Sequence, residues 1–169
     1  MPDGRAGAVA EVLLTLPDLS SPEPIMFSLH PRLAADTHLL GDLPLCRVLL
    51  MNDSQYPWLI LVPRQAGLRE VHELSPEDQA ALVHESSWLA SHLCRAVNAD
   101  KMNVANLGNV VDQLHWHVIA RFQGDAAWPA PVWGRQPAQA YTADELKATM
   151  ALLRRALAGD DQLSLHWLS

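Results

Sequence analysis

The segment QLHWHVIAR, residues 113–121, places two histidines two positions apart and a glutamine two positions before them. Successive side chains of a β-strand point to opposite faces. A strand here therefore puts Gln113, His115 and His117 on one face and the apolar residues between them on the other. Imidazoles side by side on one face act as structural groups, as metal ligands or as catalytic groups, and the spacing alone leaves these three roles open.

The surroundings of the pair argue against the metal role. Catalytic zinc usually takes three protein ligands, and no HExxH motif, cysteine or carboxylate stands at ligand spacing here. Gln113 is a poor zinc ligand, and Asp112 falls on the opposite face of the expected strand. No metal site is therefore predicted. The remaining histidines are isolated and are interpreted as structural or solvated: His30, His38, His72, His84, His92 and His166.

Composition restricts the class of protein. The chain has 169 residues, 49% of them apolar, which suits one globular domain. A formal charge of -7 argues against binding a nucleic-acid polymer, because such proteins cluster Lys and Arg. Cys46 and Cys94 lie in apolar runs and are expected to be reduced thiols. Asp3 and Glu11 make the N-terminus a poor signal peptide, and no apolar run is long enough to span a membrane, so a cytoplasmic protein is expected.

The elements that would position the pair follow from patterning. Two apolar runs, 45–52 and 58–64, flank a turn and predict an antiparallel pair of strands. Ser75 and Pro76 predict the start of a helix that runs to about Val97, with a face that is apolar except for Glu85.

Further along, residues 101–109 predict a strand that turns into its partner at 113–121. Proline excludes regular structure from the Pro- and Trp-rich stretch 126–134. A capping box of Thr142 and Glu145 predicts a last helix that stops at Gly159.

Residues 30–40, HPRLAADTHLL, predict a short helix, and residues 1–24 an N-terminal arm. The order of elements gives an α+β class with an antiparallel sheet. A main domain over 25–135 is expected, with the helix and tail at 136–169 packed on it.

The motif resembles the defining sequence of the histidine triad (HIT) family, His-φ-His-φ-His-φ-φ with φ apolar. Residues 113–119 match it except at the first position, where Gln113 stands for histidine. The resemblance extends upstream through Gly108-Asn109-Val110-Val111 and through RVLLMND followed by YPWLILVPR. Trp58-Leu59 stands where the family has Gly-His, and Val110 where it often has Ser or Thr. The resemblance implies a HIT-like fold, with about five antiparallel strands, one long helix and a C-terminal helix.

The resemblance also implies roles for individual residues. His115, the middle position, would be the nucleophile, and His117 would donate to phosphate oxygens or protonate the leaving group. Gln113 can hydrogen-bond and so orient His115 or a phosphate, but it cannot transfer a proton at neutral pH. The substrate would be bound by the side chains of Asn52, on the ribose, Asn106 and Asn109, and by the backbone at Gly108. Trp128 and Trp133 would pack in the core or on the surface, or else close the pocket or pack at a dimer interface.

Two functions compete at this point. The first is a nucleotide hydrolase or nucleotidyl transferase that attacks an α-phosphate through a covalent nucleotidyl-histidine. Its substrate would be a phosphoramidate, a phosphate ester or a dinucleoside polyphosphate, with no cofactor and with any divalent cation carried by the substrate phosphates. The alternative is a nucleotide-binding module with little or no activity. The resemblance implies a homodimer that binds a small nucleotide. The composition, as described above, argues against a membrane or a nucleic-acid polymer as a partner.

Overall fold

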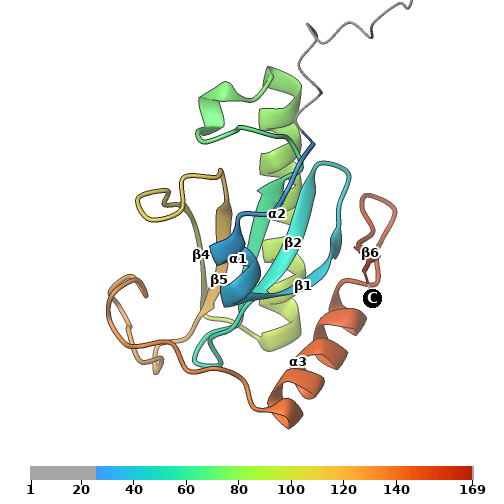
Figure 1. Ribbon diagram of the computed structural model, residues 1–169. Coiled ribbons are helices and arrows are strands. Elements are labelled where there is room, and N and C mark those ends of the chain that lie inside the picture. Colours follow the sequence, from blue (N-terminus) through green and yellow to red (C-terminus); the bar gives the residue numbers. More distant parts are fainter. Residues whose placement is uncertain (1–25, 169) are drawn as a thin grey trace, which may run out of the picture.

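The computed structural model describes residues 26–168, and the N-terminal arm lies outside the described residues. The chain forms one six-stranded sheet with helices on both faces (Figure 1). The strands are β1 (Thr37–Asp42), β2 (Cys46–Met51), β3 (Trp58–Pro63), β4 (Lys101–Asn106), β5 (Trp116–Arg121) and β6 (His166–Trp167). The helices are α1 (Pro31–Asp36), the 3-10 turn η1 (Val71–Glu73), α2 (Pro76–Val97) and α3 (Ala143–Ala156).

The sheet is antiparallel throughout and has the order β4-β5-β3-β2-β1-β6. All six residues of β3 are buried, which fits its central position and its unbroken apolar sequence. The expected α+β class is confirmed, with one strand more than the sequence indicated. That strand, β6, is two residues long and pairs with Gly41 and Asp42.

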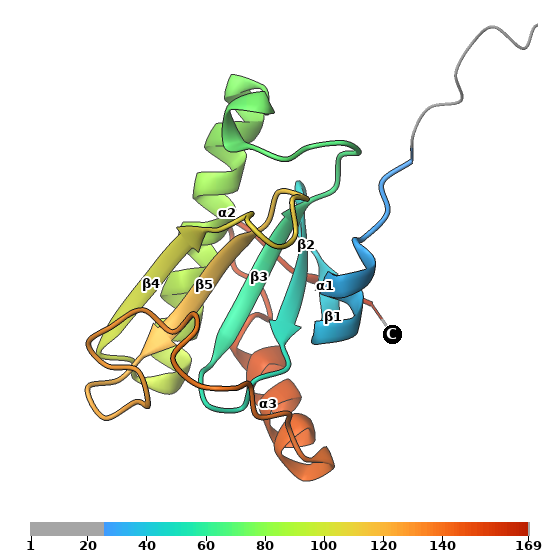
Figure 2. The same cartoon turned by 60° about the vertical axis from the view of Figure 1, so that its left-hand side comes forward.

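Each face of the sheet has its own core, because the branched residues of the central strands alternate between the two sides. On one face, Leu59 and Leu61 pack with Leu82 and Leu89 of α2 and with Leu153 of α3. On the other face, α1 and the loop after β5 cover the sheet through a second apolar cluster. Figure 2 shows α1 and α2 on opposite sides of the strands.

Helix α2 has the bounds that its cap predicts, since the Ser75 side chain accepts a hydrogen bond from the Asp78 N–H. Glu85, the exception on its apolar face, is 1% exposed. Its carboxylate accepts hydrogen bonds from the N–H groups of Leu45 (2.7 Å) and Cys46 (3.0 Å). The charge therefore fastens the helix to the start of β2, and it also raises the pKa of the Cys46 thiol beyond the effect of burial.

Three expectations about local structure are wrong. The helix expected at 30–40 ends at Asp36, because Thr37–Asp42 pairs with β2 and becomes β1. The strand expected at 113–121 begins only at Trp116. The last helix starts after Thr142 as its capping box predicts, but it ends at Ala156, before Gly159.

Candidate active site

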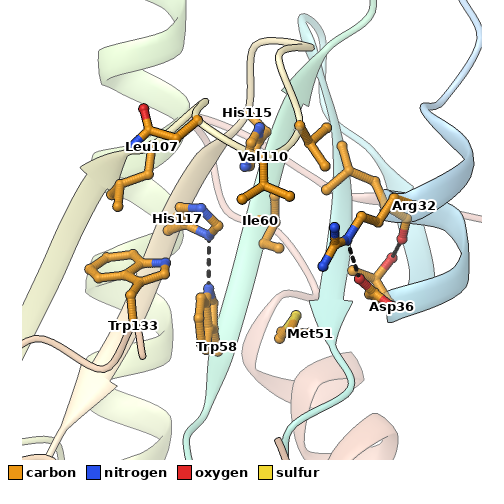
Figure 3. A pocket seen from close by; sticks show the side chains of 14 residues that line it. Arg32, Asp36, Met51, Trp58, Ile60, Leu107, Val110, His115, His117 and Trp133 are labelled. Atoms are coloured by element: carbon orange, nitrogen blue, oxygen red, sulfur yellow. Dashed lines mark hydrogen bonds and ion pairs between the residues drawn. The ribbon is translucent and has the colours of Figure 1, made fainter. Parts of the chain in front are cut away.

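His115 and His117 line one cavity of about 300 Å³ on the α1 face of the sheet (Figure 3). His117 lies on β5 and His115 immediately before it. Both residues are about 95% buried, yet they line this cavity rather than the core behind the sheet. The cavity is lined by Arg32, Leu33, Asp36, Thr37, Met51, Trp58, Ile60, Leu107, Asn109, Val110, Val111, His115, His117 and Trp133.

The tautomer of His115 is fixed by its backbone contact. Its Nδ1 lies 2.7 Å from the carbonyl oxygen of Gln113, which can only accept a hydrogen bond. The ring proton is therefore on Nδ1, and Nε2 carries a lone pair. The Asn106 amide steadies the same turn by donating to the carbonyl oxygen of His115 at 2.8 Å.

His117 has the opposite tautomer. The indole Nε1–H of Trp58 donates to its Nδ1 at 3.0 Å, and an indole N–H can only donate. The neutral ring therefore carries its proton on Nε2. Trp58 and Trp133 contact the ring edge-on, each with a centroid separation of 5.3 Å, and their own centroids are 5.7 Å apart, so the three rings form one cluster.

Burial keeps both rings uncharged at neutral pH. Burial lowers the pKa of His117 to about 3, and the nearby His115, with ring centroids 4.8 Å apart, adds to the effect. The pKa of His115 is also lowered, mainly by burial and further by His30, while the bond to the Gln113 carbonyl opposes the shift. A lone pair on Nε2 of one ring and an N–H on Nε2 of the other are thus present together.

The loop after β5 brings Trp133 to the pair. Arg121 ends β5, is 1% exposed, and forms a buried ion pair with Asp125 at 2.7 Å. Its guanidinium also donates to the Ala130 carbonyl, so the loop folds back along the sheet. Trp128, by contrast, lies outside the cavity, with its ring 5.8 Å from the Arg121 guanidinium carbon.

Of the expected substrate-binding residues, Asn109 lines the cavity. Gly108 lies between two lining residues and is not itself one, and a methyl group there would meet only the Val111 carbonyl at 3.7 Å. Asn106 contacts the site through the backbone of His115, as described above.

The structure places Asn52 outside the lining of the cavity. Its side-chain oxygen accepts a hydrogen bond from the Tyr141 N–H at 3.1 Å, so it secures the segment before α3 and does not line the cavity. Met51, one residue earlier, occupies that place in the cavity wall.

The Gln113 side chain likewise does not line the cavity. Its oxygen accepts from the His30 N–H and its nitrogen donates to the Ser28 carbonyl, both at 2.8 Å. The amide is therefore engaged by the segment that leads into α1. Gln113 orients His115 through its backbone carbonyl instead.

Two parts of the cavity wall were missed by sequence reasoning. Arg32 and Asp36, an ion pair on α1, form the side opposite the histidines (Figure 3), and an isolated short helix gives no sign of where it docks. Trp58 had a readable signal. Ile60 pairs with His117 across the strands, so alternation places Trp58 on the same face, diagonal to that ring.

Comparison with known proteins decides the family. The family model described as the HIT domain matches residues 32–124. The chain belongs to the histidine triad family. Proteins of this family are often nucleotide hydrolases or transferases. Comparison with curated proteins gave no match.

Solved structures of histidine triad proteins agree with this assignment. One from Marinobacter aquaeolei VT8 is 55% identical, with a TM-score of 0.76, over 78% of this chain and 96% of that chain. One from Bradyrhizobium japonicum is 47% identical (TM-score 0.75; 78% and 98% covered), and one from Sinorhizobium meliloti 1021 is 46% identical (TM-score 0.75; 78% and 97%). The HIT-like fold is thus confirmed over the region that carries the cavity.

Two other features are absent from the described residues. Within residues 26–168, no group of three His, Cys, Asp or Glu side chains is arranged to hold a metal ion. Across the same residues, no helix has the length and apolarity to cross a membrane.

Proposed function

We propose that this HIT protein hydrolyses or transfers the nucleotidyl group of a nucleoside phosphate derivative through a covalent nucleotidyl-His115. The observation that carries the proposal is the 2.7 Å contact between His115 Nδ1 and the Gln113 carbonyl. It leaves Nε2 as a neutral nucleophile on a ring that lines the cavity.

The reaction proceeds in two displacements. Nε2 of His115 bonds to the α-phosphorus, the bond from phosphorus to the leaving group breaks, and the leaving group keeps the electron pair. Water or an acceptor alcohol then bonds to phosphorus and gives up a proton to solvent, and the imidazole departs neutral. His117 supports both steps by donating its Nε2–H to phosphate oxygens, where negative charge collects.

The cavity suits such a substrate in size and character. A volume of about 300 Å³ lies at the lower end of small-molecule sites. Most of the wall is apolar, with Met51, Ile60 and Val111 offering a surface for a flat base. Arg32 supplies a positive charge to the wall for the substrate phosphate. A small nucleotide needs only such local donors, so the site is compatible with a net charge of -7 on the protein.

The deciding experiment removes the nucleophile. His115→Ala should abolish turnover of adenylate esters while AMP still binds, because the rest of the cavity is intact. Wild-type activity in this variant would refute the mechanism. His84→Ala is the matched control, since His84 is exposed on α2 and lies outside the cavity. In the wild type, quenching in denaturant should trap one nucleotide per chain.

The second candidate is a nucleotide-binding module with little activity. Two departures from the family motif favour it. Gln113, in place of the first histidine, has its amide engaged by Ser28 and His30, and Val110, in place of Ser or Thr, is 71% exposed on the cavity rim. Calorimetry with AMP, run beside an assay with a fluorescent adenylate leaving group, separates the two. Tight binding without turnover across a panel of substrates would favour the module.

A further inference from the structure

The contact between Trp58 and His117 limits what His117 can do for a leaving group. A general acid must hand over a proton that it can readily lose, as an imidazolium does. A neutral imidazole N–H donates a hydrogen bond but does not give up its proton near pH 7. To become an imidazolium, His117 must add a proton at Nδ1, where the Trp58 N–H already points at it from 3.0 Å.

Among residues 26–168, the groups that contact His117 or share its cavity offer no free negative charge to stabilise that proton. Trp58 of β3 and Trp133 of the loop after β5 contact the ring and carry no charge. His115 is the titratable neighbour, and its own charge would repel a second one. Arg32 and Asp36, from α1, line the same cavity but are paired with each other at 3.4 Å.

We propose that Trp58 is a positioning residue that holds His117 as a neutral Nε2–H donor, and that the site therefore selects substrates whose leaving group departs as a weakly basic anion. Phosphate, nucleoside phosphates and acidic phenols belong to this class, whereas alkylamines and alkyl alcohols do not. The inference rests on the proposed function and narrows its range of substrates.

The selection follows from where the electron pair and the proton go in the first displacement. When Nε2 of His115 bonds to phosphorus, the leaving oxygen of an anhydride takes the electron pair and departs as a stable anion, without a proton. An alkylamine would have to depart as a strongly basic amide ion unless it receives a proton. His117 in its neutral form cannot supply that proton, so solvent must.

The test compares nucleoside 5′-monophosphate derivatives that differ only in the leaving group: phenols of graded acidity, pyrophosphate and an alkylamine. In the wild type, kcat/KM should fall at least about a hundredfold from the most acidic phenol to the alkylamine, the size of a missing general acid. Comparable rates for both would leave the proposed function standing and overturn the selection. Absence of turnover for every derivative would instead refute the proposed function, and the selection with it.

Two variants isolate the indole N–H. Trp58→Phe removes the donor from Nδ1, and its smaller ring leaves room for water there, which weakens the burial that keeps His117 neutral. The gap between phenol and alkylamine should therefore narrow about tenfold or more as the pH falls from 7 to 5.5. Taking the ratio cancels the protonation of His115, which affects both substrates alike. Trp133→Phe is the matched control, because Trp133 also packs on His117 while Trp58 is the indole bonded to it. A gap that narrows equally in both variants would overturn the role of Trp58.

A measurement on the wild type needs neither a variant nor turnover. Nitrogen-15 NMR of the histidine rings should place the proton of His117 on Nε2 and show the ring neutral down to pH 5. An imidazolium at pH 6, or a proton on Nδ1, would overturn the proposal whatever the substrate panel gives.

Discussion

His115 and His117 are identical side chains two residues apart, and the atoms opposite their Nδ1 nitrogens give them different chemistry. A carbonyl faces one and an indole N–H the other. The first ring therefore offers a lone pair from Nε2, and the second offers a proton in a hydrogen bond from the same atom. A nucleophile and a donor for phosphate are thus made from one residue type, with no charged group at either position.

Burial of His117 has a consequence for stability that pH can reveal. The unfolded chain binds a proton at this residue below its ordinary pKa of 6.5, whereas the folded chain does so only near pH 3. Between these values the unfolded state holds more protons, so stability falls as the pH falls. This residue alone should cost about 1.6 kcal/mol between pH 6.5 and 5.

Chemical denaturation at the two pH values measures this cost. His117→Gln is the matched variant, because an amide oxygen can still accept from Trp58 but does not titrate. Its stability should change less over the same range. Equal losses in both proteins would show that other groups carry the dependence.

At the scale of elements, the hydrogen bonds of the Gln113 side chain to Ser28 and His30 hold the segment before α1 against the turn before β5. Gln113→Leu removes both bonds at similar volume, and the unfolding free energy should drop by about 1–3 kcal/mol. Because the backbone carbonyl remains, His115 keeps its tautomer. KM should therefore rise more than kcat falls, since α1 carries part of the cavity wall.

Amide exchange over residues 28–36 and steady-state kinetics test whether the Gln113 side chain anchors the segment before α1 rather than acting in catalysis. Gln113→His restores the first histidine of the family motif and should change the rate by less than loss of His115 does. Activity raised by several orders of magnitude in that variant would mean that Gln113 impairs the natural protein. Protection unchanged in Gln113→Leu, with kcat as low as in His115→Ala, would refute the anchoring role.

The buried carboxylate of Glu85 joins α2 to β2. Glu85→Ala leaves the N–H groups of Leu45 and Cys46 buried without their acceptor, and the cost should be about 2–4 kcal/mol. Glu77→Gln is the control on the same helix, since an exposed acid in the first turn contributes less than about 1 kcal/mol. Thermal unfolding of both variants gives the comparison, and a similar small shift in each would contradict the role of Glu85.

Structure was predictable from the sequence where the interacting residues are close together along the chain. The start of α2 depends on Ser75 and Asp78 and that of α3 on Thr142 and Glu145, so short spacings were enough. The side chain of Asn52 instead accepts a hydrogen bond from the N–H of Tyr141, 89 residues away. Such contacts exist only after folding, and local patterns do not encode them.

The same reasoning explains two of the three elements that differ from expectation. Residues 37–42 carry branched apolar side chains that suit either a helix end or a strand, and pairing with β2 and the distant β6 decides for the strand. The Gln113 side chain is hydrogen-bonded to the backbone of Ser28 and His30, more than 80 residues away, and Gln113 is not part of β5. The histidine spacing was readable, but the side-chain partners of Gln113 were not.

At the scale of the whole molecule, the sheet ends differently at its two sides. The short β6 borders β1, whereas β4 forms the other edge and exposes 43% of Val104. An open edge strand is a template for pairing with another chain. Together with the family resemblance, this favours a homodimer formed through β4 and α2.

Light scattering after gel filtration should give about twice the chain mass of 18.6 kDa. Val104→Lys places a charge on the edge and should shift the protein toward monomer at micromolar concentration. Ala66→Lys, in the loop between β3 and η1, is the control. A wild type that elutes and scatters as a monomer would contradict the dimer.

The two indoles that contact His117 also give the cavity an intrinsic fluorescence signal. Trp58 and Trp133 meet at 85° with centroids 5.7 Å apart, so a base entering between them and α1 changes the surroundings of both emitters. Occupancy should therefore be visible as quenched intrinsic fluorescence, and the difference between the two Phe variants assigns the signal. Ligands can be screened this way without labels and before any substrate is known.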